Sequence, residues 1–464
     1  MRIDFRANWL VSTAIAAVLT GVLSAAPARS ESLEQALVSA YMSNPTLAAE
    51  RANLRSTDEG VAQALSNWRP TVEFTADAGV ERNESSLRSG SARTQDRQPR
   101  SASLDLSQPL FRGGRTLAET SQAENTVMAD RARLVATEQT ILVSAATAYL
   151  DVYRDEAVLD LNKNNEAVLR RQLEATQDRF QVGEITRTDV HQAEARLARS
   201  TADRIQGEAT LEASRAAYQN TVGAAPSGTL TFPSAPPGLP ESKLESIEEA
   251  AINNPTVIAS QYDERAAVDS VDGIWGELLP SVEFTASASR DYNSAGETTR
   301  IDSAEALVTL TVPLYQSGSV YSRLRESKQQ ASELRLNVDR ERRNAIEQAT
   351  RSWENLQAAQ ARVSAFRTQI EASKIAFEGV EREAAVGSRT VLDVLDAEQE
   401  LLDARVSYTR AQRDEAVAMF ELLASIGRLT AHNLQLPVNL YDPEVHYQEV
   451  REMWTGGSSS GGAE

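Results

Sequence analysis

The chain lacks several residues and motifs that define common classes of protein. It contains no cysteine, which excludes a cysteine-linked lipid anchor on the mature protein. No phosphate-binding glycine loop, dinucleotide fingerprint or zinc-ligand spacing occurs in it. Its formal net charge of -19 argues against nucleic acid as a partner. We therefore expect no cofactor, no resident metal and no nucleic-acid partner.

Features of an enzyme are also missing. The three histidines, His191, His432 and His446, are far apart in sequence, and we expect His191 to be a surface residue. Asp393 and Asp396 are paired acids, which suit glycoside cleavage. No substrate-binding aromatic residue lies in the segment around them, however, so we expect no catalytic residue and no enzymatic role.

Long apolar runs are confined to the N-terminus. Basic residues Arg2 and Arg6 precede an apolar run over residues 9–23, and the A-P-A sequence at 26–28 resembles a cleavage site. Residues 1–30 are therefore predicted to be a secretory signal peptide rather than an anchor helix. No later stretch approaches the roughly 20 apolar residues of a membrane-spanning helix. The exported protein should thus enter a membrane only as a β-barrel.

The sequence contains an internal repeat. Gly183 and Thr186 recur as Gly387 and Thr390, at an offset of 204 positions, in the same order and context. The sequence V-E-F-T-A after Pro70 recurs after Pro280. Such ordered matches indicate a duplication, with repeats over residues 31–223 and 244–427.

Two segments stand outside the duplication. Residues 224–243 are rich in Pro, Gly and Ser and should form a linker. Residues 428–464 have no counterpart in the other repeat, and we expect this C-terminal extension to wrap the outside of the body and to end in a disordered tail.

Each repeat is predicted to combine one β-hairpin with one long helical hairpin. Alternating apolar and polar residues predict β-hairpins at about 71–110 and 281–313, the first with a polar loop near 81–100. Helical hairpins should follow over about 114–222 and 318–427, with apolar residues seven apart. Proline and glycine are absent from the first helix for ~65 residues, or ~100 Å.

The helix that begins at Thr390 carries two neighbouring acids. Thr390 and Asp393 have capping-box spacing, and Asp393 and Asp396 share one face of the first turn. Acids near a helix N-terminus complement its dipole, so capping alone could explain the pair.

Four strands are too few to close a barrel within one chain. Small membrane barrels need about eight strands. Two, three or four copies would supply 8, 12 or 16 strands, and composition does not choose among them. The long helices are charged nearly all round, so they must extend away from the membrane. The predicted fold class is mainly α with a membrane β-barrel.

The order of these elements resembles the TolC family of outer-membrane efflux and type I secretion channels. The resemblance covers about residues 31–427 and includes P-L-F-x-G-G at 109–114, T-D-V at 188–190 and V-G-S-R-T-V-L-D-V-L-D-A at 386–397. It implies a homotrimer in the outer membrane of a Gram-negative bacterium, with a shared 12-stranded β-barrel and a periplasmic α-helical barrel. It also implies two partners, a periplasmic adaptor (membrane fusion) protein and an inner-membrane ABC or RND transporter.

The resemblance assigns roles to residues at both turns. Asp393 and Asp396 match the periplasmic constriction, where three-fold acidic rings would favour cations and raise one another's pKa values. Arg389 matches a gate-latch arginine whose partners match Thr188 and Asp189; a local surface ion pair is the alternative. The turns at Gly183 and Gly387 would contact the adaptor.

Two features depart from this scheme or leave it open. Some relatives have a tyrosine before the latch arginine, where this chain has Ala384-Ala385, so fewer links should hold the closed state. Aromatic residues that could form a membrane girdle, or simply pack at the junction of barrel and helices, are Phe74, Phe111, Phe284, Tyr292 and Tyr315.

The sequence does not select a cargo for the channel. Secreted proteins, drug-like compounds and polysaccharide-related products are all compatible with it.

Two other kinds of protein are weighed against the channel. A periplasmic coiled-coil structural or adaptor protein without a pore would fractionate as soluble after osmotic shock. A general diffusion porin would need more strands per chain and would have no use for the long helices.

Overall fold

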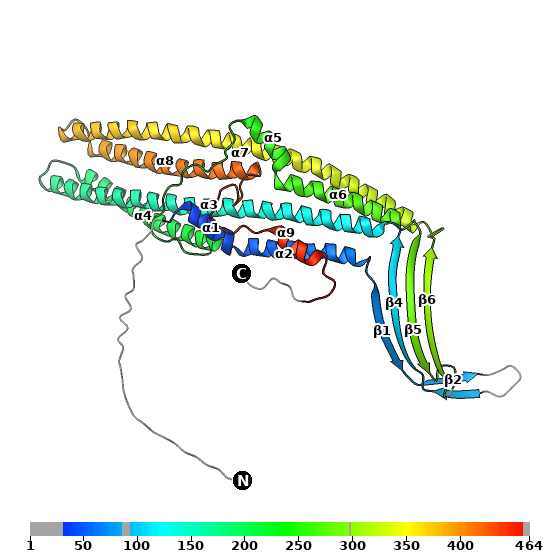
Figure 1. Ribbon diagram of the computed structural model, residues 1–464. Helices are drawn as coiled ribbons and strands as arrows, with labels where there is room; N and C mark the ends of the chain where they lie inside the picture. Colours follow the sequence, from blue (N-terminus) through cyan, green and yellow to red (C-terminus); the bar gives the residue numbers. More distant parts are fainter. Residues whose placement is uncertain (1–30, 86–92, 297, 458–464) are drawn as a thin grey trace, which may run out of the picture.

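A computed structural model describes residues 31–85, 93–296 and 298–457 of the chain. The predicted signal peptide and the last seven residues of the predicted tail lie outside the described residues. The molecule is elongated, with a sheet at one end and the two tips of the helical hairpins at the other (Figure 1). No helix in the described part has both the length and the apolar character to cross a membrane.

Four long helices form the body, as the sequence predicts. Helix α3 (Arg115–Gln181) and helix α7 (Ser319–Ala385) each contain 67 residues. They return through α4 (Arg187–Val222) and α8 (Val391–Ser425). At 1.5 Å per residue the longer helices extend about 100 Å. The mainly helical fold class is thereby confirmed.

Shorter helices flank the half of α3 and α7 that lies nearer the sheet. They are α1 (Leu33–Ser43), α2 (Pro45–Ser66), α5 (Lys243–Asn253) and α6 (Pro255–Gly276). Helix α6 packs between α3 and α7, and α2 packs along α3. Asn44 and Asn254 cap α2 and α6, each before a proline at the first helical position.

The strands of both repeats form one antiparallel sheet. Its order is β1 (Thr71–Ala78), β4 (Arg100–Arg112), β5 (Ser281–Tyr292) and β6 (Arg300–Thr311). The two β-hairpins meet where β4 pairs with β5, from Arg100↔Tyr292 to Arg112↔Ser281. Within the described ranges β1 and β6 are edge strands.

The polar loop predicted near 81–100 is in part a further, short β-hairpin, so that prediction was wrong. Strands β2 (Glu81–Ser85) and β3 (Arg93–Arg97) pair with each other. An ion pair of 2.6 Å between Arg82 and Asp96 joins them. Opposite charges on facing strands stabilise their pairing without an apolar face. Strands are recognised in the sequence by alternating apolar residues, so these two were not detected.

The main core lies at mid-length, where α1 meets the long helices. Tyr149 and Tyr218 are fully buried there, and the Tyr149 hydroxyl donates a 2.8 Å hydrogen bond to the Glu31 carbonyl. Leu429 and Ala431 of the C-terminal extension are also buried in this core. The expectation that the extension wraps the outside therefore does not hold for its first residues, which complete the core. Helix α9 (Pro443–Arg451) then packs on α2.

Candidate gate at the helical tips

The two tips share one backbone design. Gly183 and Gly387 follow the long helices with φ angles of 81° and 78°, in the left-handed region that favours glycine. The next residue bonds back to the last helical turn in each tip. Glu184 N donates to the Arg179 carbonyl, and Ser388 N to the Glu383 carbonyl, both at 2.9 Å. The predicted glycine turns are thus present.

Capping boxes begin both returning helices, as predicted at Thr390. The Asp393 carboxylate accepts from Thr390 N at 2.9 Å and from Thr390 Oγ1 at 2.8 Å. Thr186 and Asp189 repeat the arrangement at 2.9 and 2.7 Å. The hydrogen bonds from the Thr390 backbone and hydroxyl lower the pKa of Asp393. Repulsion between acidic rings, which would raise that pKa, stays a prediction for an assembly.

The Asp396 carboxylate is paired with a basic side chain in this structure. Its carboxylate forms an ion pair and hydrogen bond with Arg196 on α4, so it links the two helical hairpins of one chain. Sequence reasoning missed Arg196. The duplication offered one signal. The position of the second repeat that is equivalent to Arg196 is Glu400, which has the opposite charge.

Arg389 has a local partner. Its Nε donates to Glu383 at 2.9 Å, and both side chains are about half exposed. Thr188 and Asp189 do not meet Arg389 within the chain, so the latch stays a prediction for contacts between chains. The first tip carries a similar ion pair, between Arg179 and Glu184 at 3.0 Å, with the charges of its two ends reversed.

A third acid near the gate was also missed. Glu398 is half-buried on α8, five residues beyond Asp393. Burial raises the pKa of Glu398, the neighbouring Glu381 raises it further, and Arg171 opposes the rise. Its equivalent in the first repeat, Glu194, instead pairs with His191 at 2.9 Å on the surface. The expectation that His191 is a surface residue is thus confirmed.

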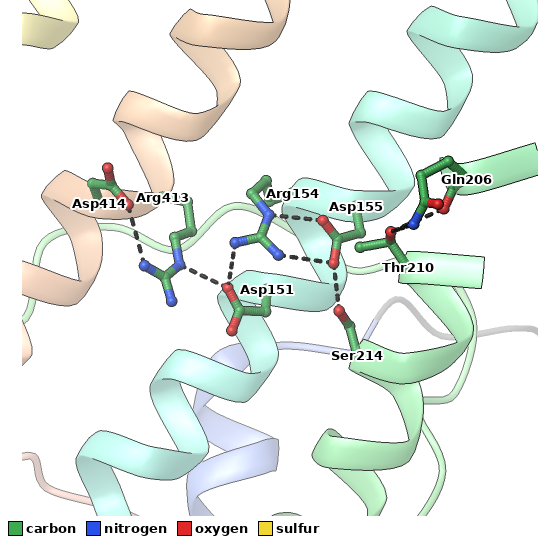
Figure 2. A network of polar contacts seen from close by, with 8 residues as sticks. All are labelled: Asp151, Arg154, Asp155, Gln206, Thr210, Ser214, Arg413 and Asp414. Atoms are coloured by element: carbon green, nitrogen blue, oxygen red, sulfur yellow. Dashed lines mark hydrogen bonds and ion pairs between the residues drawn. The ribbon is translucent and has the colours of Figure 1, made fainter. Parts of the chain in front are cut away.

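A charged network connects the helical hairpins nearer mid-length (Figure 2). Asp151 Oδ1 on α3 accepts from Arg154 Nη1 and from Arg413 Nε on α8, each at 2.8 Å. Arg154 also holds Asp155 through two bonds of 2.7 and 2.9 Å, and Asp155 accepts from Ser214 on α4. The network thereby joins α3, α4 and α8.

A polar cleft lies beside this network. It has a volume of about 640 Å³ and is lined from α3, α4 and α8, with Asp203, Asp403 and Arg410 among its residues. Among the described residues no group of three or more His, Cys, Asp or Glu side chains is arranged to hold a metal ion.

Comparison with known proteins identifies the family. The model of the outer membrane efflux protein family matches residues 36–224 and 246–428, that is, most of the chain in two parts. The chain belongs to this family, which is one of transport channels located in the outer membrane of Gram-negative bacteria rather than one of enzymes.

Particular relatives agree with this assignment. The chain is 36% identical to the outer membrane efflux protein BepC of Brucella suis, over 96% of both chains. It is 26% identical to the outer membrane protein TolC of Vibrio cholerae, over 89% of this chain and 94% of that one. Its fold matches the Campylobacter jejuni CmeC outer membrane channel with a TM-score of 0.76 at 14% identity, over 90% of this chain and 89% of that one.

Proposed function

We propose that this protein is the outer-membrane exit duct of a tripartite export system. The observation that carries the proposal is the pair of matched tips, each with a glycine turn and a capped helix, at the end opposite the sheet. The duct itself is passive. An inner-membrane ABC or RND transporter supplies the energy, and a periplasmic adaptor protein connects the two.

Three copies of the chain form the working duct. The outer edges of β1 and β6 have no partner strand among the described residues, and lipid does not tolerate an open sheet edge. Pairing β1 of one copy with β6 of the next closes a 12-stranded barrel from four strands per chain. The long helices then continue it as a tunnel into the periplasm, after residues 1–30 have been removed on export.

Asp393 and Asp396 form the constriction at the periplasmic end, and the two residues contribute unequally to its negative charge. The capping bonds of Asp393 engage only Oδ2, so Oδ1 remains for the passage. Asp396 is compensated by Arg196. The Asp393 ring therefore provides most of the negative charge and favours cations.

The closed state is held between chains by Arg389 and its partners Thr188 and Asp189. Arg389 also has a partner in its own tip, Glu383. The contact between chains therefore competes with this local ion pair, and Arg389 can exchange one partner for the other. The adaptor binds at the exposed turns of Gly183 and Gly387 and shifts the balance toward the open state.

Single-channel conductance of the purified mature protein in a planar bilayer tests the proposal. The wild type should give a small, cation-selective conductance, and Asp393→Ala/Asp396→Ala should be less selective. A pore with unchanged selectivity would remove both aspartates from the constriction. Absence of conductance from well-folded trimers would favour a structural or adaptor protein.

A further inference from the structure

The segment that follows α9 in the C-terminal extension is held at the junction of helices and sheet. Helix α9 ends at Arg451, and the following Met453 and Trp454 are 45% and 66% exposed. Arg69 Nη1 donates a 2.6 Å hydrogen bond to the Met453 carbonyl, and the Arg69 guanidinium lies 5.0 Å from the centre of the Trp454 ring. Arg69 directly precedes Pro70 and strand β1, so both exposed side chains lie at the start of the sheet.

Polar contacts fix α9 along its whole length. His446 Nδ1 lies 3.0 Å from Oδ2 of Asp58 on α2, and Asp58 is fully buried. Near the ends of α9, Glu444 pairs with Arg131, and Arg451 with Glu124 at 2.7 Å. Because these contacts reach both α2 and α3, the packing of α9 fixes the position of Met453 and Trp454.

Other exposed aromatic and apolar side chains lie at the same level. Trp68 is 37% exposed and precedes β1 by three positions, and Trp275 is 50% exposed shortly before β5. Leu314 and Tyr315, after β6, are 93% and 80% exposed. In antiparallel order, the starts of β1 and β5 and the end of β6 share one end of the sheet, the end that faces the helices (Figure 1).

This distribution has the chemistry of a membrane interface. Tryptophan and tyrosine are enriched where lipid head groups meet the acyl chains, because their rings are apolar with one polar end. Methionine adds a flexible apolar side chain. Arginine can stack on the ring and offer further donors to a lipid phosphate. A surface for another soluble protein would have no reason to follow the ends of the strands.

We propose that Met453 and Trp454, with Arg69, form an anchor of the C-terminal extension in the periplasm-facing leaflet of the outer membrane. The partner is the phospholipid bilayer itself. Trp454 lies at head-group depth, level with Trp275, and Arg69 binds a lipid phosphate. The anchor rests on the outer-membrane location of the sheet, and it ties α9, and through it α2 and α3, to the membrane surface.

Quenching of tryptophan emission by lipids with brominated acyl chains tests the anchor. The chain has five tryptophans, of which Trp9 lies in the predicted signal peptide. Variants of the full mature protein that keep only Trp454, only Trp275 or only Trp353 are reconstituted in phosphatidylcholine vesicles. Trp353, partly buried on α7 against the core, serves as the control away from the membrane. Circular dichroism and trimer content verify that each variant folds.

The expected result is loss of emission from the Trp454-only protein, comparable to the Trp275-only protein, with no loss from the Trp353-only protein. Arg69→Ala should weaken the quenching of Trp454 but not that of Trp275. Quenched Trp275 with unquenched, water-exposed Trp454 would overturn the anchor and leave the duct intact. Unquenched Trp454 with blue-shifted emission would mean that a second copy covers it, which also overturns the anchor. If Trp275 too is unquenched, the junction is not at the membrane, and the proposed duct fails with the anchor.

Discussion

Arg413 on α8 and Asp151 on α3 form a hydrogen-bonded ion pair of 2.8 Å that joins the two repeats. They are 262 positions apart in sequence. Each side chain is only about a quarter exposed, and the same Asp151 oxygen also takes a bond from Arg154. Partial burial and shared geometry make this pair stronger than an isolated surface pair.

Arg413→Ala should therefore lower the free energy of unfolding of the solubilised protein by about 1–2 kcal/mol. Denaturant titration followed by circular dichroism measures this change. Arg362→Ala is the matched control, because Arg362 lies 3.8 Å from Asp414 and is more exposed. The control should change stability by less than about 0.5 kcal/mol. Equal effects of the two substitutions would contradict a special role for the network.

Arg196→Ala should make the channel more cation-selective. The substitution removes the positive partner of Asp396 and leaves that carboxylate uncompensated in the constriction. Reversal potentials in a salt gradient measure the change. Asp393→Asn should shift them in the opposite direction, toward weaker selectivity. Arg199→Ala is the control, since Arg199 is on the same helix and its partner, Asp203, lies 3.9 Å away and is half exposed. If Arg196→Ala leaves selectivity unaltered, Asp396 does not face the passage.

Glu398→Gln should stabilise the chain at neutral pH. Because burial, and then Glu381, raise the pKa of Glu398 in the folded protein, folding favours its protonated form. The folded chain is therefore penalised above that raised pKa, and the penalty vanishes as pH falls below the ordinary glutamate value of 4.5. Thermal melting from pH 7 to pH 4 should show a gain for the variant that shrinks with acidity. Glu400→Gln, at an exposed position on the same helix, should show no such trend.

Gly387→Ala should distort the second tip. A Cβ at this position would meet no atom within 4 Å, but φ is 78°, so the whole effect is backbone strain, about 1–2 kcal/mol. Export supported by the variant should fall, and hydrogen exchange should accelerate around Ser388. Gly379→Ala is the matched control, because Gly379 is inside α7 with equally open space and helical φ. The control should be neutral or stabilising by up to about 1 kcal/mol. Unchanged exchange at the tip in Gly387→Ala would argue against the strained turn.

Local signals made much of the fold predictable. The glycine turns, the capping box of Thr390 and Asp393, and the long runs without proline or glycine each depend on neighbours within a few residues. The glycine turns and the capping boxes also recur in both repeats in the same order, so each repeat supports the other. The short hairpin of β2 and β3 escaped prediction because charge pairing, not apolar alternation, holds it.

The partners of the gate acids were not predictable in this way. Arg196 and Asp396 are 200 positions apart, and the same holds away from the gate, where His446 and Asp58 are 388 apart. Sequence spacing fixes which face of a helix an acid occupies, but not the neighbouring helix or its vertical register. The pairing depends on how the helical hairpins slide past each other, which is decided by packing along their full lengths.

The charged network of Figure 2 has no counterpart at the duplicated positions. Where the first repeat has Asp151 and the second has Arg413, the other halves have Asn355 and Ala209. In a three-copy tube, the seams within each chain would therefore carry this ion pair, and the seams between chains would not. We expect the two helical hairpins of each chain to move together in such a wall, and the wall to separate first along the boundaries between chains.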